Sequence, residues 1–419
     1  MPISYLSSDK YSRMPSIGQA IAFIGILATW DKLDDPYSCL KYYAMAATCL
    51  GFVIADKPRR GVLSSVAFVY MVSLAITAGF RPISWVGRNL CYFSAVIPMS
   101  LVCVCYHYSL RDRWKDTANV VIMACVAASV ASILQGYDMF LPQGDFFNGR
   151  VYAFMGSPVF LSGIMAMAIP LCLGRTYTPF AIPLIVTCIL LTQSRSGLMA
   201  GGMGVLGYCF ANKQIGWKSF FVGAILVLAS VMGMFSALRD VNASDKGRYH
   251  MTRVAFKSIV DNPFGIGPER FSTALAKYRD ADLDKDLGVS WSNGYVHNHI
   301  LQALVDGGPL FLAVHIFTLS LIGFFLYKHG PPAVFGCAVA MCAFGLTQPT
   351  PLVLKCILAC LVGAIDPTDR PISKTPFVLA CCLAFCVSIT TVVSAKIASN
   401  GARFGLAQMV VDAYQMFPR

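Results

Sequence analysis

Long runs of apolar residues recur along almost the whole chain, and they constrain its fold more than any other feature. A helix needs about 20 such residues to cross the hydrocarbon core of a bilayer. Charged residues make up 13% of the chain, against about 25% in a soluble domain. So few charges cannot cover a water-facing globule of 419 residues. The sequence therefore predicts an all-α, polytopic integral membrane bundle of about 12–13 transmembrane helices.

The candidate spans follow from length and hydropathy, and short polar turns connect most of them. They lie near 14–30, 39–55, 61–79, 89–107, 117–137, 157–174, 178–194, 196–211, 217–238, 298–327, 331–348, 350–366 and 375–396. One long polar interval breaks the series. The chain therefore divides into N-terminal transmembrane helices (1–238), a large loop (239–297), C-terminal transmembrane helices (298–396) and a tail (397–419).

Basic residues in the short connections predict the orientation, because loops rich in Lys and Arg stay in the cytoplasm. The connections 56–60, 111–115, 212–218 and 328–329 are basic and fall on one side when the spans alternate. The large loop falls on the opposite side and is predicted to be extracytoplasmic. The net charge of +12 fits such loops, and no basic run accompanies a soluble fold, so no nucleic-acid partner is expected.

The large loop has a helical pattern of its own. Apolar residues at helical spacing, from Met251 to Ile259, predict a helix that Asn262 and Pro263 end. A tight turn at 265–268 and a second short helix over 269–279 follow. This amphipathic pair is typical of a segment that lies on a membrane face.

An acidic run at Asp280, Asp282, Asp284 and Asp286 has the look of a metal site. An EF-hand loop needs Gly at its sixth position and Glu at its twelfth, where this chain has Lys and Trp. The run is therefore interpreted as a solvated loop face. The 16 cysteines show no CxxC pair and no zinc spacing, so neither a metal nor a cofactor is expected.

Four arginines lie on the predicted extracytoplasmic side, at Arg150, Arg195, Arg248 and Arg253. An arginine at a membrane edge either snorkels to water or marks a functional site. The second alternative is stronger for Arg195, because it stands in a very short turn between two apolar runs. A guanidinium makes bidentate bonds to phosphate, so convergent arginines indicate an anionic ligand such as a lipid-linked phosphate or diphosphate.

Two histidines stand where the large loop meets the next apolar run. His297 lies on the loop side, whereas His299 shares a helical stripe with Gln302 and Asp306. A histidine at a helix start is either a cap or interface residue, or a general base that titrates near working pH. Asn298, between the two, can orient a ring or a sugar hydroxyl.

Three motifs occur in a definite order along the chain. They are Leu-Thr-Gln-Ser-Arg-Ser-Gly at 191–197, Gly-Arg at 247–248 leading to Asp-Asn-Pro-Phe-Gly-Ile-Gly at 261–267, and His-Asn-His-Ile-Leu-Gln at 297–302; an earlier Gly-Arg at 149–150 precedes Ser-Pro at 157–158. Together they resemble the O-antigen ligase and polymerase superfamily of bacterial polytopic glycosyltransferases, over roughly residues 145–325. Thr252, Asp306 and Ser157 depart from the family pattern, which often has Trp, Glu and Asn there.

The resemblance implies an O-antigen ligase-like enzyme of lipopolysaccharide biosynthesis, at the periplasmic face of the bacterial inner membrane. The expected partners are an undecaprenyl-diphosphate-linked glycan donor, a lipid A-core or other hydroxyl acceptor, and membrane lipids. The transfer would be metal-independent, with a histidine as base and arginines stabilising the diphosphate leaving group. The implied catalytic residues are His297, Arg195 and Arg248, and the implied substrate-binding residues are Arg150, Arg253, Asn298 and His299.

Other activities stay open. An O-antigen or exopolysaccharide polymerase, or a protein O-oligosaccharyltransferase, would differ in the acceptor. Polymerases of the superfamily often show Arg-x10-Gly in two outer loops, a spacing that Arg253 misses by one residue and that Leu161 interrupts after Arg150. This favours the ligase. A lipid-linked sugar transporter would need ionisable residues inside the spans. The spans are nearly free of such residues, and Lys355 is the main exception.

Overall fold

The computed structural model describes the central part of the chain. The described residues are 114–139, 149–228 apart from 219, 222 and 226, 242–267, 270–288, 294–348, 350, 352–363 and 365, together with Leu27, 59–60 and 370–371. The spans expected near 39–55, 61–79, 89–107 and 375–396, the tail 397–419, and the span near 14–30 apart from Leu27 lie outside these residues.

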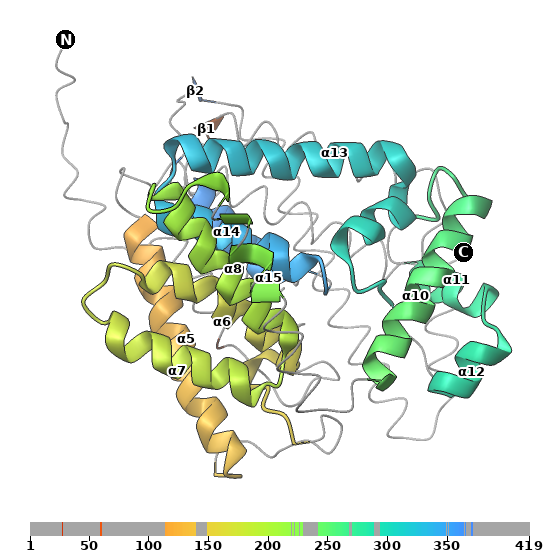
Figure 1. The fold of residues 1–419 in the computed structure, drawn as a ribbon, viewed down its shortest axis with the longest axis horizontal. Coiled ribbons are helices and arrows are strands. Elements are labelled where there is room, and N and C mark those ends of the chain that lie inside the picture. The colour runs from red at the N-terminus through yellow and green to blue at the C-terminus, as the bar shows by residue number, and fades with distance from the viewer. Residues whose placement is uncertain are drawn as a thin grey trace.

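Six helices of the described part form a bundle (Figure 1). They are α5 (Trp114–Gly136), α6 (Pro158–Cys172), α7 (Thr178–Leu191), α8 (Arg195–Ala211), α14 (Pro332–Gly345) and α15 (Leu352–Gly363). Each lies on one of the expected apolar runs. By length and composition, α5 and the later helix α13 (His299–His329) can cross a membrane. This architecture agrees with the predicted class of helical membrane protein.

Small residues on α8 allow the centre of the bundle to pack closely. A Cβ at Gly197 would lie 2.4 Å from the Cβ of Ser162 on α6, and one at Gly204 would lie 2.8 Å from the ring of Pro170. Between membrane helices close approach of this kind contributes much of the association, because lipid tails are as apolar as the side chains. The α6–α8–α14 contact therefore holds the start of α8 firmly in place.

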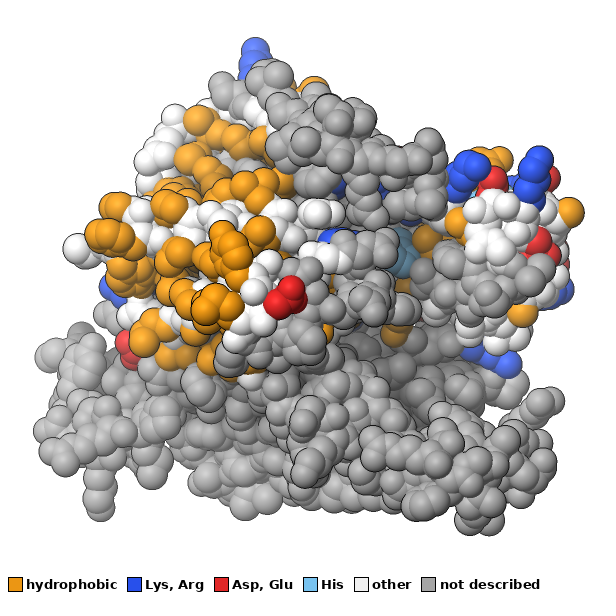
Figure 2. Space-filling model, turned by 90° about the horizontal axis from the view of Figure 1, so that it is seen from below, with side chains coloured by type: hydrophobic (Ala, Val, Ile, Leu, Met, Phe, Trp, Pro, Cys, Tyr) orange, Lys and Arg blue, Asp and Glu red, His pale blue; other side chains and the backbone are white. Residues whose placement is uncertain are grey.

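Hydrophobic and charged side chains separate between two parts of the molecule. Figure 2 shows hydrophobic side chains gathered over the bundle, with charged side chains on the part formed by the large loop. That part contains α10 (Asn242–Asp261), α11 (Phe271–Lys277) and α12 (Ala281–Leu287), which lie to one side of the bundle in Figure 1. The described chain also has a two-residue antiparallel pairing of β1 (Arg59–Arg60) with β2 (Arg370–Pro371).

The large loop has a small hydrophobic core of its own. Its buried residues come from α10, α11, α12 and the first part of α13, and include Met251, Val254, Phe271, Leu283 and Val305. Burying such side chains contributes about 1.5–3 kcal/mol each. The acidic run was expected to be a solvated loop face, and the structure corrects this expectation. It forms α12, where Asp280 caps the helix by accepting a bond from the Leu283 amide at 3.1 Å.

Helix α13 is not the single straight helix that the apolar run 298–327 predicted. Its backbone leaves the helical region at Gly308, where φ is 70° and ψ −170°, and Pro309 follows. The rings of His299 and His315 lie 4.5 Å apart between centroids. A continuous helix would separate residues sixteen positions apart by about 24 Å. The segment before Gly308 therefore folds back on the apolar segment after it.

The turn after α10 fits into this break. Ile266 and Gly267 donate backbone hydrogen bonds to the carbonyl groups of Val305 and Asp306, each at 2.9 Å. A Cβ at Gly265 would lie 2.5 Å from the Asp306 carbonyl oxygen, and one at Gly308 would lie 2.5 Å from that of Pro263. Two separate glycine-rich motifs thus form one joint, which fixes the large loop to the start of α13.

Candidate functional site

The turn between α7 and α8 presents Arg195. Ser194 caps α8, accepting a bond from the Gly197 amide at 3.3 Å, and Arg195 is the first helical residue. The Arg195 Nη2 donates to Oδ1 of Asp245 on α10 at 2.6 Å. This ion pair connects the bundle with the large loop at the predicted site.

Arg150 reaches the same turn from the segment before α6. Its Nε donates to the carbonyl oxygen of Thr192 at 2.8 Å. The following backbone is held separately, because the Gln135 side chain accepts bonds from the amides of Tyr152 and Ala153, both at 2.9 Å. The structure therefore places Arg150 beside the turn from which Arg195 projects.

Arg248, on α10, is half-buried, and the positive charge of Arg195 acts on its guanidinium. Burial lowers the pKa of Arg248, and the charge of Arg195 lowers it further, while Asp245 opposes both. A guanidinium stays charged through such a shift. Two cations thus share the single carboxylate of Asp245, and an excess of positive charge is left for an anionic ligand.

His297 lies near Arg248, whose charge acts on its ring. Burial lowers the pKa of its imidazole, the charge of Arg248 lowers it as well, and the hydrogen bond with Gln348 acts in the opposite direction. The ring is therefore neutral at neutral pH and can accept a proton. Its Nδ1 lies 2.8 Å from Oε1 of Gln348, whose Nε2 donates to the Ser196 hydroxyl at 3.3 Å.

Asn298 and His299 have structural contacts. Asn298 caps α13, since its side chain accepts a bond from the Leu301 amide at 2.9 Å and donates to the Leu346 carbonyl at 3.0 Å. His299 packs against His315 and against the end of α14, where a Cβ at Gly345 would lie 3.3 Å from its own. The structure gives both residues a packing role near His297.

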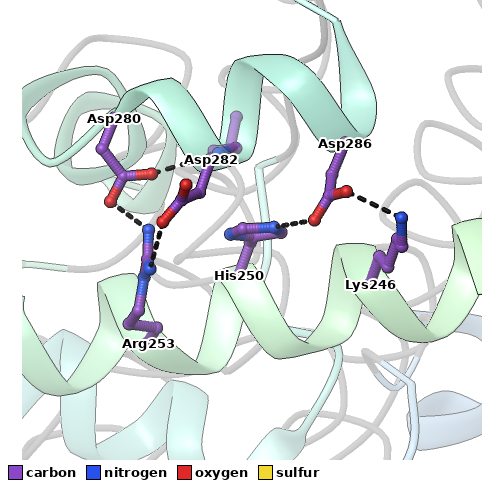
Figure 3. A network of polar contacts seen from close by, with 7 residues as sticks. Lys246, His250, Arg253, Asp280, Asp282 and Asp286 are labelled. Atoms are coloured by element: carbon purple, nitrogen blue, oxygen red, sulfur yellow. Dashed lines mark hydrogen bonds and ion pairs between the residues drawn. The ribbon is translucent and has the colours of Figure 1, made fainter.

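Arg253 directs its guanidinium toward α12. It pairs with Asp280 and, at 3.6 Å, with Asp282 (Figure 3). Lys257 also lies 3.6 Å from Asp280. One and two turns earlier on α10, His250 and Lys246 both contact Asp286, at 2.9 and 2.7 Å. Three aspartates of the acidic run therefore pair with cations of α10, whereas Asp284 pairs with Arg279 at 2.5 Å. Within the described ranges no three His, Cys, Asp or Glu residues are grouped as metal ligands.

Sequence reasoning missed two residues of this site. Asp245 lies in a polar stretch that contains no recognisable motif. Gln348 follows an apolar helix and is far from the large loop along the sequence. The signal for Gln348 was weak but present, because a polar side chain between two apolar helices costs free energy unless it has partners.

The comparison with known protein families concerns the middle of the chain. The part of the chain from 180 to 316 matches the family model described as O-antigen ligase. It includes Arg195, Arg248 and His297, whereas Arg150 and Gln348 lie outside it. No curated protein matches the chain. The described helices are those of a helical membrane protein with a cationic cluster at its helix ends, and the match over residues 180–316 supports membership of the O-antigen ligase superfamily.

Proposed function

We propose that the chain is a membrane glycosyltransferase of the ligase type. It moves a glycan from undecaprenyl diphosphate to a hydroxyl of lipid A-core oligosaccharide, at the periplasmic face of the bacterial inner membrane. The family match supports ligase or polymerase activity in general. The observation that carries the proposal is the convergence of Arg195, Arg248 and His297, which come from α8, α10 and the segment before α13.

The chemistry needs a proton acceptor and a place for negative charge. The acceptor hydroxyl gives its proton to His297 while its oxygen attacks the anomeric carbon of the donor sugar. The bond between that carbon and the diphosphate oxygen breaks, and its electron pair leaves with the diphosphate. Arg195 and Arg248 stabilise the growing charge, and Arg150 binds the donor from the neighbouring segment. Attack opposite the leaving group inverts the anomeric carbon.

Asp245 supplies a negative counter-charge for Arg195 while no donor is bound. Its carboxylate holds Arg195 at 2.6 Å, and half of its own side chain is exposed. A diphosphate carries more negative charge than one carboxylate, so it can displace Asp245 from Arg195. Arg253 is left out of the proposed donor site, because Asp280 and Asp282 occupy its guanidinium.

The test is transfer by the purified protein in nanodiscs with a synthetic undecaprenyl-diphosphate glycan. Lipid A-core, a second carrier-linked glycan and a Ser/Thr peptide are offered as acceptors, with release of undecaprenyl diphosphate as the readout and with chelator present or absent. We expect transfer to lipid A-core that chelator does not inhibit. Transfer to the second glycan or to the peptide alone would identify a polymerase or a protein glycosyltransferase.

Variants of Arg195 and of the histidines test the site itself. Arg195→Ala should abolish transfer while the protein still accumulates in the membrane, and Arg195→Lys should rescue poorly, because the planar fork is lost. His299→Ala should cost less turnover than His297→Ala. If His299→Ala were inactive and His297→Ala close to normal, the assignment of the base would be reversed.

A further inference from the structure

Gln348 is the buried polar residue that holds His297 from the opposite side of the site. It follows α14, outside the stretch that matches the family, and only 5% of its surface is exposed. Its Oε1 lies 2.8 Å from the imidazole Nδ1, and its Nε2 donates to the Ser196 hydroxyl at 3.3 Å. Both ends of this amide therefore contact the site.

The orientation of the Gln348 amide between its two contacts points to the imidazole nitrogen that carries the proton. An amide nitrogen only donates and an amide oxygen only accepts. Because Nε2 of Gln348 is directed at Ser196, its oxygen is the atom that faces His297. That oxygen needs a donor, so Nδ1 of the neutral imidazole must be protonated, and Nε2 of the ring is then the nitrogen with the lone pair.

The ring also needs an external support. His297 has a φ of 58°, in the left-handed region, and stands before the first residue of α13. The helix therefore does not fix its orientation. The support from Gln348 extends to Ser196, next to Arg195, so it sets His297 at a constant position relative to the arginine that faces the leaving group.

We infer that Gln348 is a positioning residue for the proposed reaction: it holds His297 in the tautomer protonated at Nδ1 and presents Nε2 to the acceptor hydroxyl. This inference rests on the proposed function for its catalytic meaning, but the tautomer itself is a property of the protein alone. The group that faces the ring from α10 is the cation Arg248, with Arg195 and Asp245 behind it. From the segment after α14 it is faced by neutral Gln348, which in turn contacts Ser196 of α8.

The first experiment separates positioning from packing through kinetics. Gln348→Met keeps the length of the side chain but removes the acceptor, and should lower kcat about 10- to 100-fold with the donor KM within about three-fold. Gln348→Glu keeps an acceptor and adds a negative charge, which raises the pKa of an adjacent histidine. It should retain turnover at alkaline pH and move the acid limb of kcat/KM upward. Equal losses in both variants with an unmoved pH profile would overturn the inference.

The second experiment does not depend on activity. Protein labelled with 15N-histidine is placed in nanodiscs, and the His297 signals are assigned by their loss in His297→Asn. The wild type should show a protonated Nδ1 and an unprotonated Nε2, and Gln348→Met should show a mixture of tautomers. Protonation at Nε2 in the wild type would overturn the inference. If no acceptor is glycosylated but the expected tautomer is found, the proposed function fails and the positioning contact stands.

Discussion

Helix α10 carries two polar clusters that differ in their charge balance. The site cluster contains Arg248 and Asp245 of α10 with Arg195 and His297. The clasp contains Lys246, His250, Arg253 and Lys257 of α10 with Asp280, Asp282 and Asp286 of the α12 region, and Figure 3 shows these residues apart from Lys257. Both clusters contain arginine, histidine and aspartate, so residue type does not distinguish them.

What distinguishes them is how much of the charge is already neutralised. In the clasp, each carboxylate pairs with cations on α10, and the pairs connect two elements of the same loop. In the site cluster, two guanidinium groups share one carboxylate across three elements, and a neutral imidazole stands beside them. The clasp therefore closes the fold of the loop, whereas the site cluster retains a demand for negative charge.

The largest expected difference between the clusters concerns their histidines. His297→Ala should lower turnover by at least about 100-fold, since a general base contributes about 10²–10⁴. His250→Ala should leave transfer by the folded protein close to wild type and lower its stability by about 1–3 kcal/mol, because it leaves Asp286 with one partner fewer. The measurements are in vitro transfer, donor binding and thermal unfolding. Loss of donor binding without loss of turnover in His297→Ala would make His297 a phosphate ligand instead.

The pH profile sharpens this contrast. Burial and Arg248 lower the pKa of His297 from its usual value near 6.5, so its neutral form persists at lower pH. The acid limb of kcat/KM should therefore lie below about pH 6.5. In Arg248→Gln the limb should move toward higher pH, because a cation that disfavours protonation is removed. An acid limb unchanged in this variant would mean that Arg248 does not act on His297.

The arginines should show the next largest difference. Arg248→Ala should cost about 10²–10³ in kcat/KM, the usual effect of removing one group that stabilises transition-state charge. Arg253→Ala, five residues along the same helix, should change kcat/KM only a few-fold and should instead make the loop more sensitive to protease. If Arg253→Ala were as damaging as Arg248→Ala at equal protease resistance, Arg253 would belong to the donor site.

Most of the bundle could be predicted from the sequence, because apolar runs of bilayer length leave a chain few alternatives. The bounds of α5, α6 and α8 agree with the expected runs to within a few residues. The break in α13 was missed for a physical reason. Hydropathy averaged over a window does not register that Gly308 and Pro309 interrupt the backbone, although these residues are the usual signs of a break.

The site was less accessible to sequence reasoning than the bundle. Arg195 and His297 stand in motifs, whereas Asp245 and Gln348 became meaningful only through contacts with residues 50 or more positions away. The acidic run shows the opposite difficulty. Its spacing argued against an EF-hand loop, but nothing local showed that α10 would present cations to Asp280 and Asp286.

The joint between the loop and α13 supports a fourth prediction, because both clusters depend on the placement of α10. Gly308→Ala would put a Cβ 2.5 Å from the Pro263 carbonyl oxygen at a φ of 70°. We expect at least about a ten-fold loss of transfer, through strain and displacement of the turn. Gly323→Ala on the same helix meets nothing within 4 Å and should be neutral. Equal activity of the two variants would show that α10 does not need this joint.

The smallest expected effect comes from weakening the clasp alone. Asp280→Asn keeps a good helix cap but removes the charge that faces Arg253, whereas Asp280→Ala removes both. The Asn variant should keep transfer within about two-fold of wild type, since partly exposed ion pairs contribute little. The Ala variant should expose α12 to protease more strongly. Lower transfer in Asp280→Asn with unchanged protease resistance would place the clasp within the reaction after all.

Acid should reproduce this weakening in the unmodified protein. The Leu283 amide and Arg253 hold the pKa of Asp280 below its usual value, and Lys246 and His250 do the same for Asp286. A carboxylate with a depressed pKa contributes stability above its unfolded pKa of about 3.9, and that stability is lost as the pH falls through the folded value. The clasp should therefore resist protease equally at pH 7 and pH 5 and open below about pH 4. Asp280→Asn should show part of the same sensitivity already at pH 7, because its side chain is uncharged at every pH.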